Sequence, residues 1–214
     1  MNPSANTGDP RGAYFDQLYR HDADPWLVRA RWYEERKRTL LLACLPQQRY
    51  RHAYEPGCGN GELTLALAQR CDRLLAADLS EAALQLARQR LLDAGQDGNA
   101  SFARHQLPRD WPRILPGGEK FDLIVISEIA YYLSPDQLAL LVEHCVASLA
   151  PGGTIAACHW RAPFAQRSIS TVRVHAAFQD APGLHRLLRH EEADFLLGVW
   201  SNDARSVAQR EGFA

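Results

Sequence analysis

Apolar and polar positions along the chain predict strands and helices in alternation. Short runs rich in apolar residues recur, and between them apolar residues repeat at the spacing of a helix. The expected strands cover residues 50–55, 73–77, 100–104, 121–126 and 154–160. The run Phe121–Ile126 has the apolar character expected of a parallel strand buried on both faces.

Capping residues mark where the helices should begin. Ser80 is expected to cap a helix over 81–94, and Ser134-Pro135-Asp136-Gln137 is a capping box that opens another helix. Asp24-Pro25 predicts the start of an N-terminal helix whose apolar residues recur as far as Cys44. The remaining helices are expected at residues 63–69 and 169–178.

The order of elements changes near the C-terminus. Two strand-like runs, 184–190 and 195–200, are separated by the polar residues 191–194, which predicts an antiparallel hairpin. Strand–helix units followed by a hairpin predict an α/β fold with a doubly wound, seven-stranded, mostly parallel sheet. We expect a mobile tail at 1–12 and one domain at 13–214, with a helical cap at 13–47 and a core at 48–214.

Bulk composition excludes several classes of protein. The length of 214 residues fits one domain, and the formal net charge of −1 provides no general attraction for nucleic acid or for an anionic membrane. No apolar run reaches the about 20 residues of a membrane span, and no signal-peptide pattern opens the chain. The five cysteines are scattered without a Cys-x-x-Cys pair, which indicates reduced thiols in a cytoplasmic protein with no metal site.

The segment Glu55–Gly61 carries the most specific chemistry, because it is a glycine-rich turn between the first strand and its helix. A dinucleotide fingerprint would need a third glycine where Glu62 stands, and the Glu55 carboxylate would repel a pyrophosphate. The pattern suits a phosphate-free ligand with a cationic amino-acid tail, such as S-adenosylmethionine. Asp78, at the end of the second strand, is placed to hydrogen-bond the ribose hydroxyls. The alternative is a tight strand-to-helix turn with no ligand.

Several stretches together resemble the class I S-adenosylmethionine-dependent methyltransferases, and more closely the nodulation protein S group. These stretches are Asp24-Pro25-Trp26, Trp32-Tyr33-Glu34, Arg36-Lys37, Tyr54–Cys58, Phe121–Val125, Ser127-Glu128, Tyr131-Tyr132-Leu133 and Val199-Trp200-Ser201. The resemblance covers almost the whole chain from Asp24 onward. It implies the Rossmann-like methyltransferase fold and N-methylation of a small amine, such as an amino sugar or a deacetylated oligosaccharide.

The resemblance also implies cofactor contacts. Glu55 and the glycines would line the methionine part, Asp78 would hold the ribose, and Gln106 would replace the usual acid beside the adenine, with Asp110-Trp111 as an alternative contact. Tyr33 and Arg36, or Lys37 in place of Arg36, would fold over the cofactor from the N-terminal helix and pair with its carboxylate. The alternative is that the basic residues of this helix form a solvated face. The expected cofactor-binding set is Tyr33, Arg36, Glu55, Gly57, Cys58, Gly59, Gly61, Asp78, Leu79, Gln106, Leu107 and Ser127.

Three residues near the carboxyl ends of strands are candidates for catalysis. Glu128, after the fourth strand, would contact the acceptor or accept its proton, and Tyr132 in the same loop would orient it. His159, at the end of the fifth strand, is either a base or a packed hydrogen-bonding residue. An O-methyltransferase, an NAD-dependent oxidoreductase and a non-catalytic cofactor-binding protein are the alternative functions. The resemblance and the sequence leave a monomer and a homodimer equally open.

Overall fold

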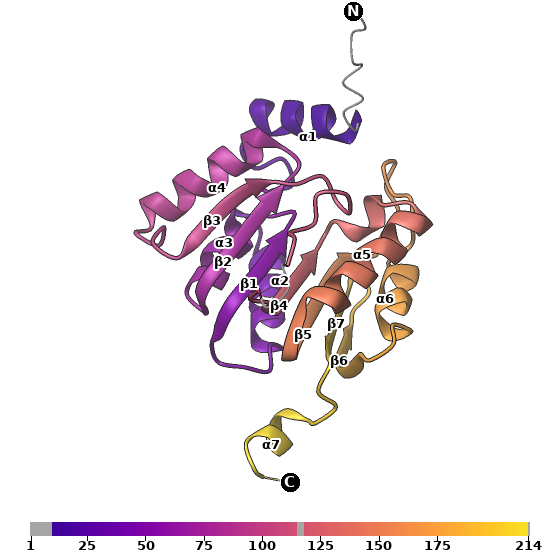
Figure 1. The fold of residues 1–214 in the computed structure, drawn as a ribbon. Coiled ribbons are helices and arrows are strands. Elements are labelled where there is room, and N and C mark those ends of the chain that lie inside the picture. Colours follow the sequence, from indigo (N-terminus) through magenta and orange to yellow (C-terminus); the bar gives the residue numbers. More distant parts are fainter. Residues whose placement is uncertain (1–9, 115–117, 214) are drawn as a thin grey trace, which may run out of the picture.

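A seven-stranded sheet forms the centre of the computed structural model, which describes residues 10–114 and 118–213. Its strands are β1 (Tyr50–Pro56), β2 (Cys71–Asp78), β3 (Ala100–Arg104), β4 (Phe121–Ser127), β5 (Leu149–Trp160), β6 (His185–Glu191) and β7 (Phe195–Ser201). They lie in the order β3-β2-β1-β4-β5-β7-β6 (Figure 1). The first five are parallel, whereas β7 pairs antiparallel with both β5 and β6. The predicted fold class and C-terminal hairpin are confirmed.

Helices cover both faces of this sheet. The helices among the described residues are α1 (Pro10–His21), α2 (Trp32–Ala43), α3 (Glu62–Ala68), α4 (Glu81–Asp93), α5 (Pro135–Ser148), α6 (Thr171–Gln179) and α7 (Val207–Arg210), with a short 3₁₀ turn, η1 (Ala130–Tyr132). Buried residues of α5 and α6 pack on one face of the sheet, and those of α2, α3 and α4 pack on the other. The sheet is therefore the middle of three layers, as expected for a doubly wound fold.

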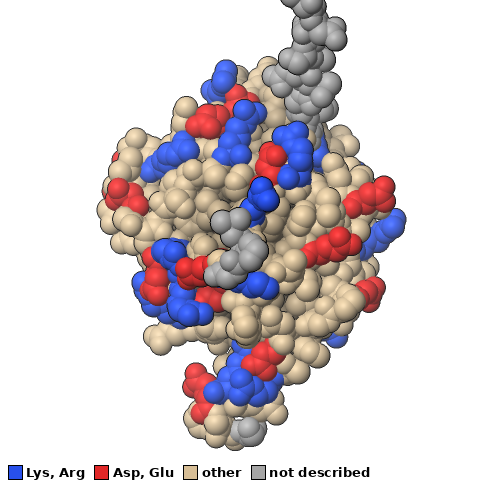
Figure 2. Space-filling model, viewed as in Figure 1, with Lys and Arg blue, Asp and Glu red and all other residues tan. Residues whose placement is uncertain are grey.

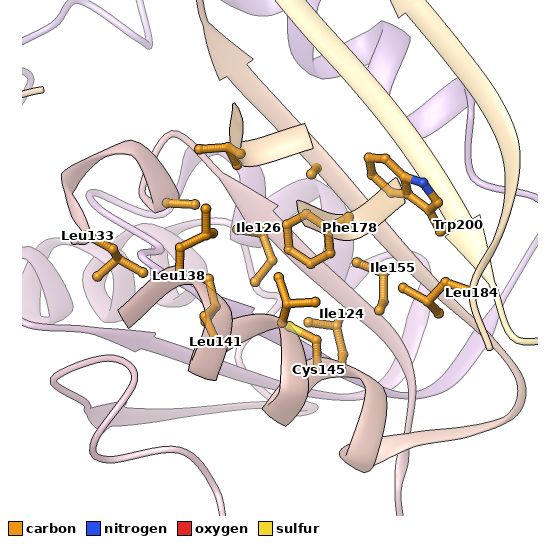
Figure 3. Packing of buried hydrophobic residues seen from close by; sticks show 14 of the residues in the cluster. Ile124, Ile126, Leu133, Leu138, Leu141, Cys145, Ile155, Phe178, Leu184 and Trp200 are labelled. Carbon is orange, nitrogen blue, oxygen red and sulfur yellow. The ribbon is translucent and has the colours of Figure 1, made fainter. Parts of the chain in front are cut away.

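Alternate residues of each strand supply the two cores. Along β4, Ile124 and Ile126 face the α5 side, whereas Leu123 and Val125 face the α2 side, because successive side chains of a strand point to opposite faces. Figure 3 shows the first core, where side chains of β4, α5 and α6 meet those of β7, among them Trp200. Strands buried on both faces explain why the apolar runs are nearly continuous.

The predicted caps identify helix starts correctly within the core. The Ser80 side chain accepts a hydrogen bond from the Ala83 backbone N–H, and Ser134 and Gln137 form the expected capping box. The strand β5 begins at Leu149, five residues before the predicted start. Its pairing with β4 jumps between Leu149 and Thr154, so the glycine-rich segment forms an irregularity within the strand.

The N-terminal cap differs from the prediction in two respects. The helix α1 begins at Pro10, inside the segment predicted as a mobile tail, and residues 1–9 lie outside the described residues. The helix predicted from Trp26 begins only at Trp32. The Asp24 carboxylate accepts hydrogen bonds from the backbone N–H groups of Val28 (2.8 Å) and Arg29 (3.0 Å), and Leu27 has φ +56°. A side chain with positive φ interrupts helical geometry, so Asp24 organises a turn there instead.

Surface properties follow the balanced composition. On the face in Figure 2, Lys and Arg are interspersed with Asp and Glu rather than gathered into one basic patch. Among residues 10–114 and 118–213, no helix is long and apolar enough to cross a membrane. The same residues contain no group of three His, Cys, Asp or Glu side chains that could hold a metal ion. None of the five cysteines forms a disulfide.

Candidate active site

A cavity of about 680 Å³ lies at the carboxyl ends of the parallel strands. Gly57 follows β1, Asp78 ends β2, Glu128 follows β4 and Trp160 ends β5, and all four line the cavity. This edge of a doubly wound sheet is where such folds bind ligands. The cavity has the size of a site for a small molecule or cofactor.

Most of the predicted site residues come together in this cavity. Those that line it are Tyr33, Glu55, Gly57, Cys58, Gly59, Asp78, Leu79, Leu107, Ser127, Glu128 and Tyr132. Four predicted residues are not part of its lining: Arg36, Gly61, Gln106 and His159. The glycine-rich turn, the ends of β2 and β4 and the cap helix α2 therefore share one site.

The glycine-rich turn has a backbone that only glycine adopts easily. Gly59 has φ +55° and Gly61 has φ +84°, and a Cβ on Gly61 would lie 2.8 Å from the Ala87 Cα. Gly61 therefore allows α3 to pack against α4 rather than lining the cavity. The Asp78 carboxylate accepts a hydrogen bond from the Gly59 N–H at 3.0 Å. Asp78 thus fixes the turn, while its remaining lone pairs can still accept hydrogen bonds from a ligand.

Glu55 is a buried carboxylate that faces the cavity. It is 2% exposed, and its Oε2 has no hydrogen-bond partner among the described residues. Burial raises the pKa of Glu55 to about 8, and the negative charge of Asp78 acts in the same direction, whereas the neighbouring Thr64 hydroxyl lowers it. A buried acceptor without a donor is costly, so this side chain is well suited to a ligand that brings a cationic donor.

The adenine region differs from the prediction. The Gln106 backbone N–H donates to the Asp110 carboxylate at 2.9 Å, and the Gln106 side chain is not part of the cavity wall. Trp111 packs in the core, where its indole N–H donates to the Ser148 hydroxyl at 3.1 Å. Sequence reasoning missed His105, which lines the cavity immediately after β3.

His105 is held in place by a second buried side chain. Its Nδ1 lies 2.9 Å from the Tyr54 hydroxyl, and burial lowers the pKa of this histidine. Its place in the sequence could have indicated this residue, because His105 directly follows the third strand, just as Asp78 ends the second strand. Together with Leu79 and Leu107 it forms the wall beyond Asp78.

Glu128 has an unusual conformation at the far end of the cavity. Its φ is +58°, a strained value for a residue with a side chain. Its Oε1 accepts from Lys37 Nζ at 2.6 Å, and its Oε2 accepts from the Tyr131 hydroxyl at 2.7 Å and the Trp160 N–H at 2.8 Å. Three donors therefore hold this carboxylate in the cavity wall.

The structure favours the packed alternative for His159 over the role of a base. This residue is fully buried and outside the cavity, with Nδ1 3.2 Å from His175 Nε2. Its Nε2 accepts from the Ala130 N–H at 3.3 Å. Burial lowers the pKa of His159 to about 3, so the ring is neutral and packed rather than available to a substrate.

Arg36 also has a different role from the one predicted. Its guanidinium donates two hydrogen bonds to the Glu192 carboxylate, at 2.7 and 2.8 Å, and so ties α2 to the hairpin between β6 and β7. The neighbouring Lys37, the alternative to Arg36 in the sequence prediction, is buried and lines the cavity instead. Of these two candidate cations of α2, the one that faces the cavity is therefore Lys37 and not Arg36.

Aromatic rings enclose the space beside Glu128. Tyr132 packs edge-on against Phe15 and Phe164, with ring centroids 5.2 and 5.5 Å apart, and all three line the cavity. Tyr33 packs edge-on against Trp160 at 5.6 Å. The helix α1 contributes Phe15 and is anchored on α4, because Asp16 accepts from the Ala82 N–H at 3.0 Å. The N-terminal cap thus completes the cavity.

A parallel sheet with an antiparallel hairpin, a glycine-rich turn and an acid at the end of β2 together define the class I methyltransferase fold and site. Residues 53–153 match the family described as a methyltransferase domain. A solved structure of a Pseudomonas syringae protein assigned as a methyltransferase is 46% identical, with a TM-score of 0.67. The match covers 80% of this chain and 99% of that one. The chain belongs to class I of the S-adenosylmethionine-dependent methyltransferases.

Two further comparisons identify the chain as a NodS-like member of this class. The crystal structure of the N-methyltransferase NodS from Bradyrhizobium japonicum WM9 in complex with S-adenosyl-L-homocysteine is 26% identical, with a TM-score of 0.76. That match covers 91% of this chain and 99% of NodS. Nodulation protein S of Rhizobium tropici is 29% identical over 166 residues, which are 72% of this chain. The match spans 66% of that curated relative's length.

The cofactor of this family, S-adenosylmethionine, fits the chemistry of the cavity. Its amino-acid tail carries an ammonium group, for which the unpartnered Oε2 of Glu55 is a suitable acceptor. The Gly57–Gly59 backbone reaches the cavity wall without a Cβ at either glycine, and the side chains of Tyr19 and Ile129 lie close beside it. No cationic side chain that would favour a pyrophosphate projects from this turn, which is consistent with a phosphate-free nucleoside.

Proposed function

We propose that this protein transfers the methyl group of S-adenosylmethionine to the nitrogen of a small amine, such as an amino sugar or a deacetylated oligosaccharide. The observation that carries the proposal is the Glu128 carboxylate, held in an aromatic chamber that opens from the same cavity as the glycine-rich turn. A carboxylate among aromatic rings favours an acceptor that combines a cation with a ring. Similarity to the N-methyltransferase NodS supports the same choice.

One set of cavity residues would bind the cofactor, and another would bind the acceptor. Glu55 would pair with the cofactor's ammonium group, Asp78 would accept from its ribose hydroxyls, and His105 and Leu107 would flank its base. Ser127 and Tyr33 also line the cavity. When bound, S-adenosylmethionine supplies a methyl group on a sulfonium, which is activated for displacement.

The chain's own contribution to the reaction would be alignment and proton removal. An amine must lose a proton before its lone pair can attack, and Glu128 lies where it can accept a hydrogen bond from an acceptor ammonium. Tyr132 would pack against the acceptor ring and set its angle of approach. Aromatic walls on both sides exclude water and hold the nucleophile in line, and such alignment provides much of the rate enhancement in a transfer of this kind.

Product analysis by mass spectrometry tests the proposal. We would incubate the protein with S-adenosylmethionine and chitooligosaccharides that are either deacetylated at the terminal sugar or fully N-acetylated. Methylation of the free amine alone is expected. Methylation of both substrates at oxygen would instead indicate an O-methyltransferase, and calorimetric binding of NAD without S-adenosylhomocysteine would exclude both transfer reactions.

Glu128→Gln provides the matched variant for this assay. It keeps the volume of the side chain but removes the charge, so turnover should fall by about 100-fold or more if Glu128 accepts the proton. Glu143→Gln, on the exposed face of α5, is the control and should retain full activity. Equal turnover by the two variants would remove Glu128 from the proposed mechanism.

A further inference from the structure

Lys37 places a buried ammonium group at the acceptor end of the cavity. Its side chain is 8% exposed, and its Nζ lies 2.6 Å from Glu128 Oε1 and 2.9 Å from Glu34 Oε2. The same nitrogen lies 5.3 Å from the centroid of the Tyr33 ring. Two carboxylates and the face of an aromatic ring together form a binding site for a primary ammonium group.

The charges of the Glu34–Lys37–Glu128 cluster do not cancel. Glu34 and Glu128 bring two negative charges, whereas Lys37 brings one positive charge, and all three side chains line the cavity. Burial lowers the pKa of Lys37, but the two carboxylates outweigh burial and raise it above its ordinary value. Lys37 therefore stays charged, and the cluster presents one excess negative charge to the cavity.

The contacts of Glu128 leave one place for an incoming donor. Its Oε2 accepts from both Tyr131 and Trp160, which uses both lone pairs of that oxygen. Its Oε1 accepts from Lys37, so one lone pair of Oε1 stays available. The Glu128 side chain is 28% exposed, and this free position can therefore receive a ligand in the cavity.

We propose that Lys37 is a positioning residue whose ammonium group holds Glu128 in the orientation that receives the acceptor amine. The excess negative charge of the Glu34–Lys37–Glu128 cluster then selects a cationic acceptor over a neutral one of the same shape. This inference rests on the proposed function, because it concerns the acceptor end of the same site. Lysine suits the position, since a compact ammonium can donate to two carboxylates at once, whereas a planar guanidinium favours one.

Kinetics of Lys37 variants test the positioning role. For Lys37→Met, kcat for the amine should fall about 100-fold because Glu128 loses its alignment, while S-adenosylhomocysteine affinity stays within about twofold. Lys120→Met, which changes the chain's other lysine at an exposed position, is the matched control. Unchanged kcat in Lys37→Met would overturn the proposal.

Glu34→Gln tests charge selection separately. It leaves the Lys37–Glu128 pair intact but neutralises the cluster, so KM for the cationic acceptor should rise about tenfold with little change in kcat. Glu35→Gln, the exposed neighbour on the same helix, should change neither constant. An unchanged KM in Glu34→Gln would overturn the selection of cations by this cluster.

A binding experiment tests the site without turnover. Lys37→Ala should bind ethylammonium in the vacated position, so that calorimetry with S-adenosylhomocysteine present detects one more bound equivalent than in the wild type. The double variant Glu34→Gln/Lys37→Ala should bind it more weakly. Ethylammonium should also restore turnover to Lys37→Ala in a saturable manner, which a merely structural role of Lys37 would not produce.

The outcomes separate this inference from the proposed function. Wild-type protein that methylates no amine, combined with ethylammonium binding by Lys37→Ala, would refute the proposed function and leave the ammonium site standing. Amine methylation by the wild type without ethylammonium binding or rescue in Lys37→Ala would refute the inference alone. Affinity for S-adenosylhomocysteine shows in every case that the variant is folded.

Discussion

Replacing Glu55 with glutamine should abolish a proton release that accompanies cofactor binding. In the ligand-free protein the Glu55 pKa is about 8, against an ordinary value of 4.5, because the carboxyl is buried and near the charge of Asp78. An ammonium group placed beside it would favour the ionised form instead. Binding of the cofactor should therefore expel the proton that Glu55 carries.

The expected size of this effect follows from the pKa. At pH 7 the solution is one unit below a pKa of about 8, so about nine-tenths of the molecules carry the proton before binding. Binding should then release about 0.9 proton at pH 7. The affinity for S-adenosylhomocysteine should also increase about tenfold between pH 6 and pH 7, because the competing proton becomes ten times scarcer.

Calorimetry in buffers of different ionisation enthalpy measures the released proton. The apparent binding enthalpy of the wild type should change with the buffer in proportion to the proton count, whereas Glu55→Gln should show the same enthalpy in every buffer. Groups shared by both proteins cancel in the difference. A buffer-independent enthalpy in the wild type at pH 7, or equal proton release by the variant, would refute the placement of Glu55 beside the ammonium.

The same carboxyl group should make the stability of the ligand-free protein depend on pH. A pKa raised in the folded state stabilises the fold below pH 4.5, and this contribution is lost as the pH rises through about 8. The 3.5-unit difference corresponds to at most about 5 kcal/mol. Urea unfolding of Glu55→Gln should lack this loss of stability between pH 5 and pH 8.

Three further predictions concern the turn, the buried histidine and the hairpin contact. Gly61→Ala should lower the free energy of unfolding in urea by about 2–5 kcal/mol, because the backbone is strained and the new methyl group overlaps α4. Gly95 also has a positive φ but has no neighbour within 4 Å, so Gly95→Ala should lower it by only about 1–2 kcal/mol. Equal losses would contradict the packing argument. Burial lowers the pKa of His159 to about 3, so the free energy of unfolding should be highest above pH 6.5 and should decrease as the pH falls toward 3. Unfolding measured at several pH values should show a weaker pH dependence for His159→Gln. Arg36→Ala should leave S-adenosylhomocysteine affinity within about twofold, since its guanidinium binds Glu192, and a tenfold loss by calorimetry would restore its predicted cofactor role.

Local sequence signals predicted the core because the relevant interactions are local. Ser80 and Ser134 lie within a few residues of the N–H groups that they cap, so the sequence alone contains both partners. The glycine-rich turn is equally local, since glycine at φ +55° or +84° depends on the backbone of that turn. The predicted helix start at Trp26 was wrong because Leu27 takes a positive φ, which no apolar spacing reveals. The helix itself is present at Trp32–Ala43.

Long-range partners explain what sequence reasoning missed. His159 meets His175 across the core, and Gln106, whose backbone N–H donates to Asp110, does not line the cavity. In both cases the residue type was compatible with a site. The choice between packing and function depended on a neighbour that spacing along the chain does not identify.

Arg36 and Lys37 show that helix geometry alone identifies candidate positions but does not choose between them. A helix turns by about 100° per residue, so these neighbours point in directions about 100° apart, and only one can share the cavity face with Tyr33. Lys37 stands four residues after Tyr33, which is the spacing of side chains stacked on one face. Arg36, at three residues, lies on the other side of Tyr33. Spacing therefore made both positions candidates. Lys37 lies in the site because it pairs with Glu128 after β4, whereas Arg36 pairs with Glu192 in the hairpin.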